Sequence, residues 1–254
     1  LRLCNEALAG EPQPDLLQLR SRVHEIRGDR EAAAKDLRNM AEMEGLAEGG
    51  FLALGQFHVR QGQPDLALAS WREGLAVVPG SVPLRMQLAG VLLADSDEPR
   101  RTEGLRILED LLVERPGDIA LLLMRAEHLA RTRPGEGEKA LEEIIRKYPN
   151  SAEAYRGAAR VAISRGRLDR ARELAEKGLN ANPRDVELLL LRSQILLEKS
   201  PQLAVVSARQ AMEIQPTNEK AAIGLADALA KSGDIKRAVE LLEQFLQKSE
   251  AGPG

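Results

Sequence analysis

The feature that most limits the fold of this chain is a proline that recurs at nearly constant spacing. Prolines stand at positions 79, 116, 149, 183 and 216, so successive ones are 33 to 37 residues apart. Pro12 lies two such periods before the first of them, and Gly45 stands near the middle of that gap. Each of these prolines, and Gly45, follows a segment rich in alanine, leucine and glutamate. Those three residue types favour an α-helix, whereas proline and glycine end a helix. The spacing predicts a series of similar helical units rather than one closed core.

A second mark divides most units in two. In four of them a glycine is followed five residues later by an alanine, as in Gly166 and Ala171. A glycine that ends one helix and an alanine inside the next predict two helices per period. Because one helix pair cannot bury its apolar stripe alone, neighbouring pairs must stack and share a continuous core. The chain is therefore predicted to be all-α.

These marks, together with the large residues between them, resemble the tetratricopeptide repeat family. The resemblance covers nearly the whole chain and is clearest over residues 48–81 and 152–185. It is carried by Phe51, Leu54, Gly55, Gly62, Ala67, Trp71 and Pro79 in the first stretch and by Tyr155, Ala159, Gly166, Ala171 and Pro183 in the second. It implies a right-handed α-α superhelical solenoid.

The same register predicts the domain organisation. Seven repeats are expected within residues 14–248, starting near 14, 48, 82, 119, 152, 186 and 219. Residues 1–12 are expected to be the second helix of a truncated repeat, and 249–254 a flexible tail. Three segments depart from the register. Residues 94–103 should lengthen a turn, 131–140 should shift the register, and 198–204 should shorten a turn.

Composition argues against several classes of partner. The net charge is −3 and aromatic residues make up 2% of the chain, which disfavours nucleic acid because it needs positive charge and stacking platforms. No apolar run is long enough for direct membrane insertion. The single cysteine, Cys4, leaves bacterial cytoplasm and periplasm both open, and the excess of arginine over lysine favours a bacterial source. Leu1 as first residue suggests a fragment of a larger protein.

No residue pattern supports catalysis, a metal site or a cofactor. Cys4 and Trp71 fall at core-facing positions of the predicted helices. His24 and His58 occupy the same position in adjacent repeats, roughly 10 Å or more apart, which is too far for one metal ion. His128 has no His or Cys one helical turn on. The chain is therefore predicted not to be an enzyme, and any active site would have to lie on a neighbouring domain.

The resemblance implies that the first helix of each pair lines a concave surface, and we assign the binding site there. Apolar residues at these positions, beyond those needed for the core, would form a patch that a partner covers. The alternative is that the predicted helix register is wrong by one position, in which case the leucines assigned to the groove belong to the core. The predicted groove residues are Leu52, Gln56, Met86, Leu93, Leu123, Met124, Glu127, Arg156, Arg160, Leu190, Leu191, Gln194 and Leu197.

Arg156 and Arg160 lie one helical turn apart and would pair either with a carboxylate of a bound chain or with Glu153 or Glu187. The clamp by which some family members hold chaperone tails is not matched. Its nearest equivalents here lack both asparagines and the last arginine; they are Arg156, Arg160, Leu191, Lys220 and Gly224.

The predicted function is a protein interaction scaffold that binds a protein or peptide segment in its concave groove. The alternative is a periplasmic spacer in a bacterial envelope secretion or exopolysaccharide export apparatus. End-to-end self-association is a further expectation, because cutting an array exposes the apolar faces of its terminal helices.

Overall fold

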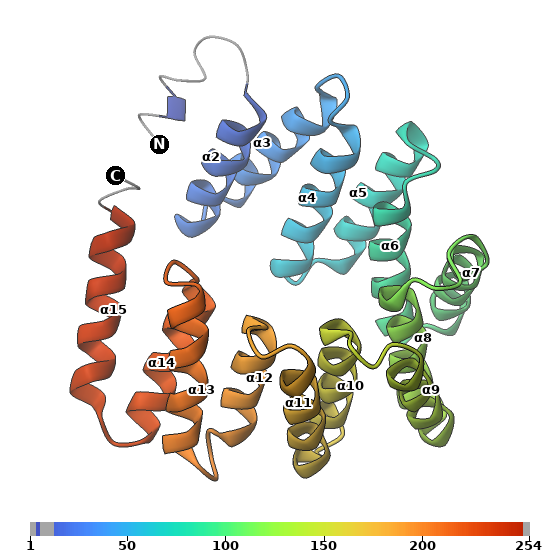
Figure 1. Cartoon of the computed structure of the whole chain (residues 1–254). Helices are drawn as coiled ribbons and strands as arrows, with labels where there is room; N and C mark the ends of the chain where they lie inside the picture. The colour runs from blue at the N-terminus through green and yellow to red at the C-terminus, as the bar shows by residue number, and fades with distance from the viewer. Residues whose placement is uncertain (1–3, 6–12, 251–254) are drawn as a thin grey trace. The chain divides into compact units, whose positions relative to one another are not determined.

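The computed structural model of the chain describes residues 4–5 and 13–250 (Figure 1). Every regular element in this part is an α-helix, and none of the described residues lies in a β-strand. The prediction of an all-α chain is confirmed. Most of the helix predicted over residues 1–12 and most of the predicted tail lie outside the described residues. The chain divides into two compact units, Leu1–Leu121 and Leu122–Gly254, which are described one at a time.

The first unit consists of three antiparallel helix pairs. Each helix packs against the next along the chain, and the first helices of the second and third pairs, α4 and α6, also contact each other. The helices are α2 (Pro14–Ile26), α3 (Arg30–Glu42), α4 (Ala47–Arg60), α5 (Pro64–Val77), α6 (Val82–Ala94) and α7 (Glu98–Glu114).

The second unit repeats this arrangement. Its last three pairs are α10 with α11, α12 with α13 and α14 with α15, and the first helices α10, α12 and α14 lie side by side. The helices are α8 (Ile119–Thr132), which begins just before the boundary, α9 (Pro134–Lys147), α10 (Ala152–Ser164), α11 (Leu168–Ala181), α12 (Val186–Leu196), α13 (Pro201–Ile214), α14 (Glu219–Lys231) and α15 (Ile235–Glu250).

Glycines make the turns inside four of the helix pairs. Gly166 has a φ of 70°, in the left-handed region that L residues rarely adopt. Its N–H donates to the carbonyl of Ile163 at 2.8 Å, and the N–H of Arg167 donates to the carbonyl of Ala162 at 2.9 Å. The second of these hydrogen bonds spans six residues, from Ala162 to Arg167. It closes the end of the helix, and the chain turns there into the next helix. The same conformation recurs at Gly28, Gly62 and Gly233.

Replacing a turn glycine should destabilise the second unit measurably. Gly166→Ala forces a Cβ into the left-handed region and should lower the free energy of unfolding by about 1 kcal/mol. Gly135→Ala in α9 is the matched control, because an added Cβ there meets no atom within 4 Å and the φ is not positive. Urea unfolding followed by circular dichroism would measure both. Equal stability of the two variants would contradict this role of Gly166.

Large apolar residues and glycines interlock in the core of each unit. In the first unit an added Cβ on Gly74 would lie 2.7 Å from the Cβ of Phe51. In the second unit an added Cβ on the equivalent Gly178 would likewise lie 2.7 Å from the Cβ of Tyr155. These glycines let an aromatic ring of a first helix lie directly on the backbone of a second helix.

The added residues of the third pair do not lengthen its turn, contrary to the sequence expectation. The turn after α6 contains only residues 95–97, and α7 is 17 residues long instead. The reason is local: the Asp97 side chain accepts from the N–H of Arg100 at 3.2 Å and starts the helix early. The turn between α12 and α13, in the sixth pair, is likewise not shortened. The sixth repeat is shorter in its first helix instead, because α12 has only 11 residues.

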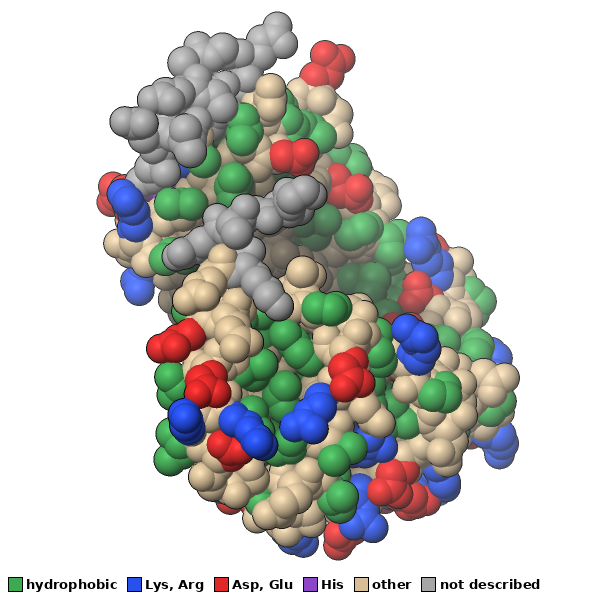
Figure 2. Space-filling model, turned by 60° about the vertical axis from the view of Figure 1, so that its left-hand side comes forward, with side chains coloured by type: hydrophobic (Ala, Val, Ile, Leu, Met, Phe, Trp, Pro, Cys, Tyr) green, Lys and Arg blue, Asp and Glu red, His purple; other side chains and the backbone are tan. Residues whose placement is uncertain are grey.

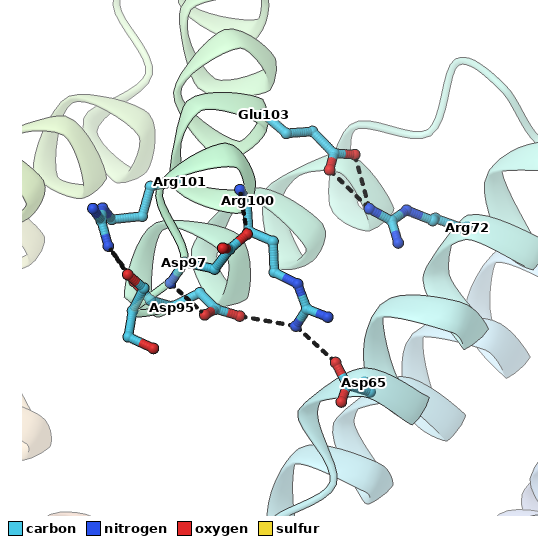
Figure 3. Close-up of polar contacts among 8 residues, drawn as sticks. Asp65, Arg72, Asp95, Asp97, Arg100, Arg101 and Glu103 are labelled. Carbon is cyan, nitrogen blue, oxygen red and sulfur yellow. Dashed lines mark hydrogen bonds and ion pairs between the residues drawn. The ribbon is translucent and has the colours of Figure 1, made fainter.

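Ion pairs hold this enlarged third pair against α5 (Figure 3). Arg100 Nη1 lies 2.7 Å from Asp65 Oδ1 and 3.0 Å from Asp95 Oδ2. Arg72 donates to both carboxylate oxygens of Glu103, at 3.0 and 2.8 Å. The N–H of Asp97 and the Arg100 guanidinium together lower the pKa of Asp95. The turn is therefore ordered by its own side chains and lies against the preceding repeat.

Candidate functional site

The first helices α12 and α14 present equivalent residues to a common face. Positions one repeat apart are separated by 33 residues, so Leu190 corresponds to Ile223, and Gln194 to Asp227. Side chains three or four residues apart share one face of a helix, and neighbouring first helices therefore form a continuous surface. This surface is hollowed between α10, α12 and α14.

The hollow is a groove of about 470 Å³ in the second unit. Its floor is apolar and is formed mainly by side chains of α12 and α14, and charged side chains stand at its edges. The lining residues are Arg160, Glu187, Leu190, Leu191, Ser193, Gln194, Leu197, Lys220, Ile223, Gly224 and Asp227. Ile223 is 46% exposed, so a large aliphatic side chain is presented to solvent inside the groove.

A glycine keeps this groove open. At Gly157 of α10, the place of a Cβ is already filled by Leu123, whose Cδ atoms lie 2.6 and 2.7 Å from it. At the corresponding Gly224 of α14 the nearest atom is the Cδ2 of Leu190, 3.4 Å away, which is ordinary van der Waals distance. The leucine of α12 thus leaves space over Gly224, whereas the leucine of α8 closes the space over Gly157.

The charges of the groove are unevenly paired. Glu187 lies between two cations: its Oε2 is 3.3 Å from Arg160 Nη2, and its Oε1 is 3.8 Å from Lys220 Nζ. Arg156 pairs outside the groove with Asp185, at 3.2 Å, whose other oxygen caps α12 at the N–H of Leu188. Asp227 makes no ion pair or side-chain hydrogen bond with any residue that the structure describes.

Five of the residues that the sequence assigned to the site are brought together here. They are Arg160, Leu190, Leu191, Gln194 and Leu197, of which Leu191 is a buried core residue at 7% exposure. The sequence assignment missed Ile223 and Asp227 because it stopped at the sixth repeat. The repeat itself contains the signal that finds them: adding 33 to the positions of Leu190 and Gln194 gives these two residues.

The other assigned residues of the second unit lie elsewhere. Leu123 is only 7% exposed and packs on Gly157, so it is a core residue rather than a groove residue. Arg156 and Met124 are half-buried. Glu127 is exposed, and its pKa is raised because nearby protein reduces its solvation, although Arg131 and Arg160 favour the charged form.

In the first unit the assigned residues do not form one site. Leu93 is 2% exposed and belongs to the core, as the alternative register implies. Leu52 packs partly on the core and Met86 is half-buried. Gln56 lies in a separate groove of about 380 Å³, lined by residues of α2, α3 and α4.

This groove of the first unit is more polar than the groove of the second unit. Arg60 donates from Nε and Nη2 to the two carboxylate oxygens of Glu25, at 3.0 Å each. This pairing lowers the pKa of Glu25. Leu19 is the large aliphatic side chain in its lining that reaches solvent. The groove therefore offers less apolar surface to a partner.

Two of the three histidines, His24 and His58, have their ring contacts within the same helix pair. His24 Nδ1 lies 3.4 Å from Asp29 Oδ2, and His58 Nδ1 lies 3.1 Å from Gln63 Oε1. Each ring thus contacts the residue five positions on, across the turn. No group of three His, Cys, Asp or Glu side chains in the described part is arranged to hold a metal ion. Among the described helices none has the length and apolarity to cross a membrane.

Comparison with known proteins identifies the family. Two family profiles described as tetratricopeptide repeat match the chain, one over residues 128–195 and 196–249 and the other over residues 50–73. Together these matches span more than half of the chain. The chain belongs to the tetratricopeptide repeat family, as its glycines, alanines and helix pairs indicate.

Individual relatives are distant. The antiviral innate immune response effector IFIT1 of Macaca fascicularis is 28% identical over an alignment of 133 positions, which covers 44% of this chain and 28% of that protein. Yeast Tom70 superimposes with a TM-score of 0.69 at 16% identity, covering 96% of this chain and 53% of that one. The human IFIT1 dimer with m7Gppp-AAAA superimposes with a TM-score of 0.51 at 18% identity, covering 93% of this chain and 68% of that one. The structural likenesses show the fold alone, and the chain spans only part of each relative.

Proposed function

We propose that this chain is a non-enzymatic interaction module that holds a segment of a partner protein in the groove between α10, α12 and α14. The observation that supports this most directly is the exposed apolar floor. Leu190, Leu197 and Ile223 reach solvent in a hollow whose edges are charged. Burying such a floor under a bound segment removes apolar surface from water, and the charged edges restrict which segment fits.

A protein segment suits this groove better than nucleic acid does. Its two cations, Arg160 and Lys220, are balanced by two carboxylates, Glu187 and Asp227, so the lining offers no net positive charge to a phosphate backbone. No aromatic residue lines it, so bases have no ring to stack on. On the face drawn in Figure 2, basic and acidic side chains are intermixed, and apolar ones lie among them. The human IFIT1 structure with m7Gppp-AAAA nevertheless makes that molecule the appropriate competing probe.

The groove is tested by placing a charge on its floor. Ile223→Asp should weaken binding of a selected peptide about tenfold or more, since losing one buried aliphatic side chain costs about 1.5–3 kcal/mol. Peptides would be selected from a displayed random library against the whole chain, and their affinities measured by fluorescence polarisation. Because Ile223 is half exposed, the change should leave the unfolding transition nearly unaltered.

Val206→Asp is the matched control. Val206 lies on α13, outside the groove, and is 49% exposed, close to the exposure of Ile223. This variant should bind the selected peptides as the unaltered chain does. Equal binding by both variants would refute the groove assignment. Tighter binding of m7Gppp-AAAA than of any peptide, weakened by Ile223→Asp, would point to nucleic acid instead.

A further inference from the structure

The space above Gly224 defines a seat for one side chain of the bound segment. The place of a Cβ on Gly224 is 3.4 Å from Leu190 Cδ2, so the walls touch this point without filling it. Ile223, next in sequence, and Leu190 on the neighbouring helix flank the seat with aliphatic carbon. A large apolar side chain would replace water there and contact carbon on two sides.

The charge beside this seat is acidic and unpaired. Asp227 lies three residues after Gly224, so the two share one face of α14 about 5 Å apart along the helix axis. Of the remaining charges of the lining, the two cations Arg160 and Lys220 share the one carboxylate of Glu187. The carboxylate of Asp227 therefore favours a cation beside Gly224.

We propose that the groove recognises a segment in which a large apolar residue is followed or preceded closely by Lys or Arg, with the apolar side chain over Gly224 and the cation on Asp227. This specificity rests on the proposed function of the groove. In an extended segment the two residues would be about two positions apart, because each residue advances about 3.3 Å. In a helical segment they would be three or four positions apart.

An acidic segment fits the same surface less well. A carboxylate of the partner would have to compete with Glu187 for Arg160 and Lys220, and it would be repelled by Asp227. Charge at this position should therefore decide between otherwise similar apolar segments. Because the pair is partly exposed, the discrimination should be about threefold to fivefold rather than many orders of magnitude.

The test uses two peptide selections from one displayed library of twelve-residue peptides with a fixed central leucine and random flanks. One selection is made against the whole unaltered chain and the other against Asp227→Lys. The first should enrich Lys and Arg at two to four positions from the leucine, and the second should enrich Asp and Glu there. Peptides enriched on the unaltered chain should bind Asp227→Lys about threefold to fivefold more weakly. Peptides enriched on Asp227→Lys should bind the unaltered chain more weakly by the same factor.

A second pair of variants tests the seat. Gly224→Leu should fill the seat and weaken binding of the enriched peptides about tenfold. Gly224→Ala should change their affinity less than about threefold. Both replace glycine within a helix, where other residues are better helix formers, and circular dichroism would verify that they fold.

The outcomes separate this inference from the proposed function. If both selections give peptides of the same charge, and Ile223→Asp weakens them, the groove binds protein segments but Asp227 does not select them, and the inference is wrong. Unchanged affinity in Gly224→Leu would likewise overturn the seat. If no peptide is enriched over a selection against Ile223→Asp, the proposed function and the inference both fail.

Discussion

Trp71→Ala should lower the free energy of unfolding of the first unit by about 3–5 kcal/mol. The side chain is fully buried, at 0% exposure, and belongs to the core cluster that links α3, α4, α5 and α6. Its ring lies on Gly55 so closely that an added Cβ there would be 2.1 Å from the indole Nε1. Removing the ring leaves a cavity that neighbouring backbone is too constrained to fill.

Chemical unfolding in urea, followed by circular dichroism, would measure this loss. Arg72→Ala, at the next position, removes only an exposed ion pair with Glu103 and should cost less than about 1 kcal/mol. Trp71→Phe should cost less than Trp71→Ala, because much of the ring remains and the buried indole N–H, which has no partner in the described structure, is removed. Similar losses for Arg72→Ala and Trp71→Ala would contradict the assigned role of the ring.

Arg20→Ala should have the second large effect, a loss of about 3 kcal/mol. Arg20 donates from Nε and Nη2 to the two carboxylate oxygens of Asp36, at 2.8 and 2.6 Å. Asp36 is 3% exposed, so the variant leaves a carboxylate buried without its cation. The arginine is itself partly exposed, which allows some water to reach the site and keeps the loss below the upper end of the range for buried pairs.

The sixth repeat contains a natural control for this pair. Arg192 occupies the equivalent position on α12, but its partners are the Ser207 hydroxyl at 2.9 Å and the Gln210 amide oxygen at 3.0 Å. Arg192→Ala leaves neutral groups behind and should cost about 1 kcal/mol. Urea unfolding would compare the two. An equal loss would show that the buried carboxylate is not what makes Arg20 important, and Arg20→Met with Asp36→Leu should recover much of the stability lost in Arg20→Ala.

The helices could be predicted from local signals. The glycine at 166 predicts a turn because few other residues adopt its left-handed φ, and the structure has Gly166 at 70°. Small residues in the second helices predict close packing, and Ala171 is fully buried. The lengths of individual elements were less predictable. Asp97 placed the extra residues of the third pair in α7 rather than in a turn, because a cap decides where a helix starts.

The candidate site could be predicted only in part. Leu93 and Leu197 are the same distance from the starts of α6 and α12, yet Leu93 is buried and Leu197 lines the groove. Similarly, Leu123 and Leu190 occupy equivalent positions, and each faces a glycine of the following first helix. Nothing in the pattern along one helix distinguishes the members of these pairs.

By itself, the sequence determined that the chain forms pairs of α-helices with tight glycine turns, because these depend on residues close together along the chain. Only the tertiary structure decided which leucines are core and which remain in a groove, and it also left Asp227 as the unpaired charge there. The physical reason is that exposure and pairing depend on the side chain opposite, on a helix about 33 residues away. A difference of less than 1 Å in how leucine approaches glycine closes the surface at Gly157 and leaves it open at Gly224.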